Sequence, residues 1–191
     1  MTVELGQGES VILQATDGQL PAVVRVELGW RQVPRRGLFA RRAPAVDLDA
    51  IAVLYAQRQL ADVVFFKHLT SNDGSVRHSG DRLVPGGGET DESIVVDLCR
   101  VPEQISQIVF AVNSSTGQTF QRIADTDCRL LDEGTGQELA RYRLPGGGAN
   151  TAQVMAKVFR GEDGGWRLEA IGAPARAAGF QELLPAIAAH L

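Results

Sequence analysis

Cysteine is scarce in this chain, because only Cys99 and Cys128 occur among its 191 residues. Both lie in stretches where apolar residues alternate, so we expect two reduced, buried thiols rather than a disulfide. No apolar run approaches the roughly 18 residues that a membrane-spanning helix requires. Residues 1–10 also lack the basic start and apolar stretch of a signal peptide. We therefore expect a cytoplasmic protein with no membrane span.

The sequence patterns of common catalytic sites are missing as well. Histidine occurs at His68, His78 and His190, which is too few and too scattered for a zinc site. There is no His-Glu-x-x-His, Cys-x-x-Cys or Gly-x-Ser-x-Gly pattern, and neither glycine triplet precedes the Lys-Ser or Lys-Thr of a phosphate loop. Ser75, His78 and Asp81 recur at three-residue intervals, which hydrogen bonds within one loop explain better than hydrolysis. We therefore expect a protein that is not an enzyme.

The bulk composition is that of a globular protein. A hydrophobic content of 44% is enough to bury a core without help from metals or disulfides, and the length fits one domain over residues 1–191. The net charge of -4 gives no reason to expect a nucleic acid as the partner.

Apolar residues recur mainly with a period of two, which is typical of β-strands. Short runs rich in Val, Ile, Leu or aromatic residues are separated by turn signals such as Asp73-Gly74 and Asp163–Gly165. The runs are Val24–Leu28, Ile51–Tyr55, Val63–Phe66, Ile94–Leu98, Ile108–Val112, Cys128–Leu131, Leu139–Leu144, Met155–Phe159 and Trp166–Ile171. This spacing predicts an all-β chain, an antiparallel sandwich or barrel.

Helical periodicity is confined to the tail and to one possible turn at Pro102–Ile105. Within Ala177–His190, apolar side chains at helical spacing predict a short helix that Pro185 limits and that docks on the sheets. We expect both tryptophans, Trp30 and Trp166, to fill the core or its edge.

Carboxylates gather in two places. Asp47 and Asp49 precede the run that begins at Ile51, and residues two apart on an extended chain point to one face, about 6–7 Å from each other. Such carboxylates repel each other unless water or a cation lies between them. The second group is Asp73, Asp81, Glu89, Asp91 and Glu92, in a glycine-rich stretch. Hard cations such as calcium take six to eight oxygen ligands, so the pattern suggests a metal site.

An EF-hand does not explain the second group. Asp81–Glu92 spans twelve positions with Gly86 at the sixth, but the third and fifth positions are Leu83 and Pro85, which offer no side-chain oxygen. The flanking residues also favour strands rather than helices.

The longest motif is Phe65–Asp81, with the sequence FFKHLTSNDGSVRHSGD. It resembles the central signature of the TerD family, in which an apolar-aromatic strand runs into an Asn-Leu-x-Ser-x-Asp-Gly-Ser-Val-x-His-x-Gly-Asp loop. Other similar elements, in the family's order, are Leu28-Gly29-Trp30, Asp47-Leu48-Asp49-Ala50, Asp91-Glu92-Ser93 and Leu139-Ala140-Arg141-Tyr142. Together they cover nearly the whole chain.

The resemblance implies an antiparallel β-sandwich of two sheets with a short C-terminal helix. It also implies calcium binding by the acidic loops and a cytoplasmic, non-enzymatic role in tellurite resistance or stress response, with other stress-response proteins as partners. The ligands it implies are Asp47, Asp49, Asp73, Asp81, Asp91 and Glu92.

The chain departs from the family pattern in two places, and these departures suggest an alternative function. Residues 82–90 hold one carboxylate, Glu89, where the family has several acidic residues, so a weaker calcium site is expected. The segment after Trp30 is rich in arginine, with five within twelve residues, where the family is acidic or polar: Arg31, Arg35, Arg36, Arg41 and Arg42. The alternative is a metal-free interaction module whose Arg35, Arg36, Arg41 and Arg42 bind an acidic or phosphorylated partner.

Overall fold

The computed structural model describes residues 2–15, 18–33, 47–79, 89–146 and 148–191, with the backbone alone for Glu89, Thr90, Asp91 and Pro145. The strands are β1 (Val3–Leu5), β2 (Ser10–Ile12), β3 (Val23–Gln32), β4 (Asp49–Ala56), β5 (Gln59–Val64), β6 (Val76–His78), β7 (Glu89–Asp97), β8 (Gln107–Asn113), β9 (Ile123–Asp132), β10 (Glu138–Pro145), β11 (Ala152–Arg160) and β12 (Trp166–Ala175). A 3-10 turn, η2 (Phe120–Arg122), precedes β9, and the helix α1 spans Phe180–Ala188.

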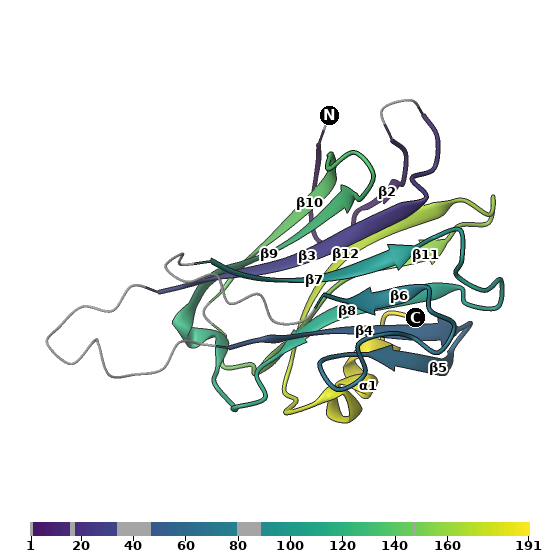
Figure 1. Cartoon of the computed structure of the whole chain (residues 1–191). Coiled ribbons are helices and arrows are strands. Elements are labelled where there is room, and N and C mark those ends of the chain that lie inside the picture. Colours follow the sequence, from purple (N-terminus) through teal and green to yellow (C-terminus); the bar gives the residue numbers. More distant parts are fainter. Residues whose placement is uncertain (1, 16–17, 34–46, 80–88, 147) are drawn as a thin grey trace, which may run out of the picture.

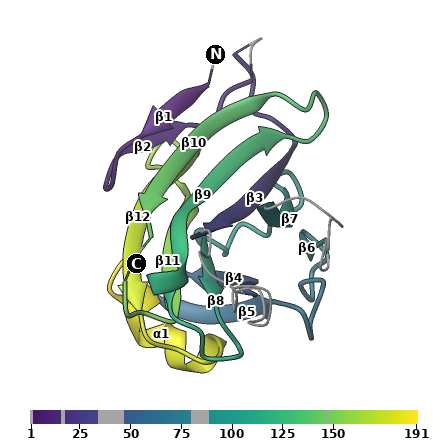
Figure 2. The ribbon, with the colours of Figure 1, turned by 90° about the vertical axis from the view of Figure 1, so that its left-hand side faces the viewer.

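The strands form two six-stranded sheets that face each other (Figures 1 and 2). Sheet A has the order β1-β10-β9-β3-β7-β6, and sheet B has the order β2-β12-β11-β8-β4-β5. The edge strand β1 pairs with β10 in parallel, and the other strand pairs of the two sheets are antiparallel. The β-sandwich predicted from the sequence is therefore confirmed, and the barrel is not formed.

Alternate residues of the sheet A strands point into the core between the sheets. The inward residues of β3 are Val24, Val26, Leu28 and Trp30, each at most 2% exposed. They pack with the inward residues of sheet B, and Trp166 at the start of β12 belongs to the same cluster. The prediction that both tryptophans fill the core is confirmed.

A second apolar cluster lies on the outer face of sheet B, where α1 covers it (Figure 2). Leu183 and Ile187 of the helix are fully buried against this face. Two basic side chains hold the C-terminal end of the helix: Arg58 donates to the carbonyl of Leu191 at 2.7 Å, and Lys157 donates to that of His190 at 2.6 Å. The predicted tail helix is thus present, somewhat shorter than Ala177–His190.

Each of the nine predicted runs lies in or overlaps a strand of the structure. The sequence did not predict β1, β2 and β6, which have three residues each and so show no periodicity. Pro102–Ile105 forms a turn, closed by a hydrogen bond from the Ile105 amide to the Pro102 carbonyl at 2.9 Å.

The expectation of two buried thiols is half wrong. Both cysteines are free, and Cys128 is buried in β9, but Cys99 is exposed. The apolar alternation that suggested burial belongs to β7, which ends at Asp97, so Cys99 falls on the turn that follows the strand.

Two glycines with left-handed backbone provide a test of the packing. Gly172 of β12 has φ +67°, and a Cβ there would overlap the Tyr142 hydroxyl and lie 2.7 Å from Leu144 Cδ2. Gly164 has φ +77° in a turn with open space around it. Both Ala substitutions carry about 1–2 kcal/mol of backbone strain, and Gly172→Ala adds about 1–3 kcal/mol of overpacking. Urea unfolding should therefore show a clearly larger loss for Gly172→Ala, whereas equal losses would contradict this packing.

Candidate metal centre

Three strand ends meet at one end of the sandwich (Figure 1). β3 ends at Gln32 and β7 begins at Glu89, and these ends are neighbours because Arg31 pairs with Glu89. The start of β4, at Asp49, lies next to them, because the carboxylate of Glu92 in β7 reaches the backbone of Ala50. The two acidic groups recognised in the sequence are thus brought together in part, although some forty residues separate them.

Glu92 makes the link between the two sheets. It sits opposite Leu28 in the ladder, faces the interior and is only 5% exposed. Its Oε2 accepts a hydrogen bond from the amide of Ala50. The pairing of β4 with β5 ends at Ala52, so β5 offers no acceptor to the amide of Ala50. The carboxylate of Glu92 supplies that acceptor instead. Leaving a buried group of this kind unpaired costs about 1–3 kcal/mol.

His78 at the end of β6 lies beside the same carboxylate. Its Nε2 is 3.4 Å from Glu92 Oε2, and its side chain is completely buried. The sequence placed His78 only in a weak Ser-His-Asp trio. The spacing of His78 from Val76 could have indicated its burial, because residues two apart on a strand share a face. Val76 is buried in the core.

Asp47 and Asp49 lie on either side of Leu48, which is fully buried and anchors the entry into β4. Asp47 is exposed, whereas Asp49 is half-buried. The Asp49 Oδ2 atom is buried and has no hydrogen-bond partner among the described residues. Burying a carboxylate oxygen without a donor is unfavourable, and a bound cation is one group that removes this penalty.

Asp73 has a different environment from these residues. Its Oδ1 accepts hydrogen bonds from the Ser71 hydroxyl at 3.0 Å and from the Ser75 amide at 2.6 Å, which closes the turn before β6. Burial raises the pKa of Asp73, but these hydrogen bonds and the charge of Arg100 outweigh it and hold the pKa below its ordinary value.

The position of Asp73 is also remote from Glu92. The carbonyl of Ser75 accepts from the amide of Asp97, five residues beyond Glu92 on β7. At about 3.3 Å per residue this separation is roughly 16 Å. The structure therefore does not bring Asp73 to Glu92.

The remaining predicted ligands are only partly described. Asp81 lies outside the described residues, and Asp91 is known by its backbone, which pairs with Gly29. Among the described residues, no three His, Cys, Asp or Glu side chains come close enough to hold one metal ion. The described side chains therefore do not form a metal site by themselves, and a site at this end needs further oxygen ligands. Oxygen donors of this kind suit a hard cation such as calcium.

Of the arginine-rich segment, Arg35, Arg36, Arg41 and Arg42 lie outside the described residues, and Arg31 is the described member. Arg31 forms an ion pair with Asp125 on the outer face of sheet A. It lines a polar pocket of about 300 Å³ with residues of β9 and β10. The pocket residues are Arg31, Asp125, Thr126, Asp127, Arg129, Arg141 and Arg143.

The fold and this end of the molecule define a class: a two-sheet β-sandwich in which a buried carboxylate of β7 accepts a hydrogen bond from the start of β4. The family model for the TerD domain matches residues 1–189, and the chain belongs to the TerD family.

Curated relatives agree with this assignment. The chain is 36% identical over 175 residues to the tellurium resistance protein TerZ of Serratia marcescens, with 90% of this chain and 85% of that protein covered. It is 33% identical over 181 residues to general stress protein 16U of Bacillus subtilis (strain 168), with 90% of each covered. The relatives support a general role in tellurium resistance or stress response.

Solved structures share the fold. A homologue of telluride resistance protein (TerD) from Streptomyces coelicolor A3(2) superposes with a TM-score of 0.65 at 22% identity, covering 85% of this chain and 95% of that one. Within the described residues, no helix is long and apolar enough to span a membrane.

The two thiols should differ sharply in reactivity. Burial, with a smaller effect of Asp127, raises the pKa of Cys128 to about 12, whereas Cys99 is exposed. Because the thiolate is the reactive form, we expect a disulfide reagent at neutral pH to titrate one thiol in the native protein and two after denaturation. Cys99→Ser should abolish the native reaction. Two fast thiols in native protein would show that Cys128 is accessible.

Proposed function

We propose that this chain is a calcium-binding module of a tellurium-resistance or stress-response system, which acts by metal-dependent binding or scaffolding rather than by catalysis. The names of its relatives support the general role. The observation that carries the calcium part is the buried Oδ2 of Asp49, which has no hydrogen-bond partner among the described residues and lies one residue from the amide that donates to Glu92.

The electrostatics of this end support a cation. Glu92 is buried and Asp49 is half-buried, so solvent screens their charges less than it screens exposed carboxylates. A divalent cation would supply the counter-charge to Asp49 and satisfy its orphaned oxygen. Asp47, Asp49 and Glu92 are the described residues from which we propose that ligands come, although in the described arrangement these three do not reach one ion together. Asp81 and Asp91 are the further ligands proposed.

Metal binding would act at the end of the sandwich where β3, β4 and β7 meet. The bound ion would join β4 of sheet B to β7 of sheet A. Because the ligands come from separate segments, binding would favour one arrangement of this end of the sandwich. That change is the proposed means by which calcium controls a partner.

Calcium titration of chelator-stripped protein by calorimetry tests this function. We expect saturable binding at micromolar affinity or tighter, with much weaker binding of magnesium, which keeps its water shell and demands a smaller octahedral site. Free calcium at about 100 times the dissociation constant should add about 2.7 kcal/mol to the free energy of unfolding.

A variant with Asp47→Asn and Asp49→Asn should lose both the heat and the stabilisation. The matched control is Glu103→Gln with Glu162→Gln, which changes the net charge equally at exposed positions far from the three strand ends. If the aspartate variant keeps its calcium response, these ligands are wrongly assigned. If calcium at millimolar concentration gives no heat with the unaltered protein, the calcium proposal fails.

A second candidate function has a separate basis in the arginine pocket. Four guanidinium groups and two carboxylates line it, and the Arg143 side chain is 59% exposed and lies 4.0 Å from the carboxylate of Glu4. Arg31 connects this pocket to the arginine-rich segment of the sequence. We propose, as the alternative, that this surface binds an acidic or phosphorylated partner.

A phosphoserine-containing acidic peptide is the probe for the alternative. Arg143→Gln, or Arg35→Glu with Arg36→Glu, should each weaken its binding by about tenfold or more, since each removes charge-assisted hydrogen bonds. Calcium binding should be unchanged in these variants. Arg176→Gln, at an exposed site on the connection to α1, is the control. Equal peptide affinity in all four proteins would rule out the arginine surface.

A further inference from the structure

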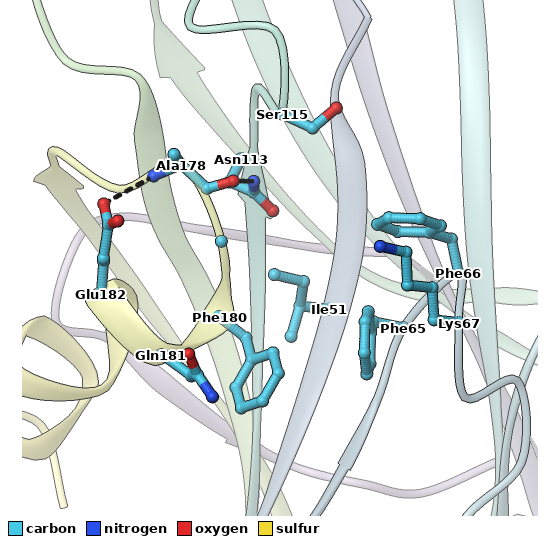
Figure 3. A pocket seen from close by; sticks show the side chains of 11 residues that line it. Ile51, Phe65, Phe66, Lys67, Asn113, Ser115, Ala178, Phe180, Gln181 and Glu182 are labelled. Atoms are coloured by element: carbon cyan, nitrogen blue, oxygen red, sulfur yellow. Dashed lines mark hydrogen bonds between the residues drawn. The ribbon is translucent and has the colours of Figure 1, made fainter.

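A cavity of about 440 Å³ opens between the start of α1 and the turn that follows β5 (Figure 3). One wall is formed by residues 178–182, and the other by Phe65, Phe66 and Lys67. Ile51 of β4 and Asn113 of β8 line it from the outer face of sheet B. Its volume lies in the range of about 300–1,000 Å³ that is typical of small-molecule sites.

Aromatic contacts hold the two walls in place. The Phe65 ring packs against Phe180 of the helix with centroids 5.2 Å apart, and against Phe66 edge-on at 5.6 Å. The Phe65 turn is closed by paired backbone hydrogen bonds with His68, at 3.0 and 2.8 Å. Phe66 nevertheless remains 44% exposed, so an apolar surface is available at the mouth of the cavity.

The lining carries one charge of each sign, on opposite sides of the cavity (Figure 3). The Lys67 ammonium lies 5.2 Å from the centroid of the Phe66 ring and makes no ion pair with any carboxylate of the described residues. Glu182 lies on the helix side, where its Oε2 accepts from the Ala178 amide at 2.9 Å. An anion on the Phe66 side of the cavity can therefore pair with Lys67.

The opposite wall contains the start of α1. Gly179 has no side chain to accept from the first helical amides, and the carboxylate of Glu182 lies in the first turn. Asn113, buried at the inner end, donates from Nδ2 to the Ala178 carbonyl at 3.2 Å, which fixes its amide within the lining (Figure 3).

We propose that this cavity binds a small organic anion with an aromatic or aliphatic body, such as an aryl carboxylate. The apolar body lies against Phe66, Phe180 and Ile51, and the anionic group pairs with Lys67. The cavity adjoins the proposed calcium ligand Asp49, which is paired with Asn113, so it is tested with chelator present to keep the two proposals apart.

Naphthoate and its uncharged analogue naphthalenemethanol are the probes, titrated into isotope-labelled full-length protein and followed by amide chemical shifts. We expect saturable naphthoate binding with shifts at residues 65–67 and 178–182. The neutral analogue should bind about tenfold more weakly, because it lacks the charge-assisted contact. No saturable binding, or shifts elsewhere in the molecule, would overturn the proposal.

Lys67→Gln, at an exposed position, should reduce naphthoate affinity to that of the neutral analogue. Arg176→Gln removes the same charge from an exposed residue outside the cavity and should leave the affinity within about twofold. Unchanged affinity in Lys67→Gln, or an equal loss in Arg176→Gln, would contradict a specific pairing with Lys67. Phe66→Ala should weaken both probes, because both use the apolar wall.

Discussion

The burial of two apolar sheet faces against each other is the constraint on which the rest of this structure depends. Sheet A is covered on one face, so buried and partly exposed residues alternate over residues 23–28 of β3 and residues 125–132 of β9. Sheet B is covered on both faces near its middle, because α1 packs on the outer side. β8 is accordingly buried at all seven positions, and β4 is buried from Ala50 to Tyr55. The burial patterns of the two sheets differ because sheet A keeps one face from water, whereas the middle of sheet B keeps both faces from water.

The acidic end of the molecule is a consequence of this packing. Glu92 occupies an inward position on β7, where an uncharged side chain would be expected. It is tolerated because the Ala50 amide and the neighbouring His78 provide polar contacts in the interior. The same contact holds β7 of one sheet to β4 of the other, at the residue that follows Asp49. A proposed calcium site at this end thus uses a carboxylate that the fold has already placed.

The strands were predictable because each long strand buries at least one face and so imprints its period on the sequence. β1, β2 and β6 were not, because three residues are too few for a period, and the parallel pairing of β1 with β10 has no local signal. Cys99 was misjudged because an alternating pattern does not show where the strand ends. Within the candidate site, the sequence identified the Asp and Glu side chains, which are oxygen donors of the kind that a hard cation binds.

The three-dimensional arrangement of the site residues could not be predicted from the sequence. The hydrogen bond from Ala50 to Glu92 joins segments forty-two residues apart and leaves no local pattern. Asp73 shows the converse, because its neighbours Ser71 and Ser75 in the sequence are also its hydrogen-bond partners, and the sequence did predict a turn at Asp73-Gly74. The aromatic cavity escaped notice because Phe65 and Phe180 are distant in the sequence and meet through α1.

The position of a bound cation tests the central claim most directly. Crystals grown with calcium, or with terbium as an anomalous scatterer in its place, would locate the ion. We expect it at the end where β3, β4 and β7 meet, within about 2.3–2.6 Å of a carboxylate oxygen of Asp49 or Glu92. An ordered ion held elsewhere, such as at Asp73, or no ion at saturating calcium, would contradict the proposed site.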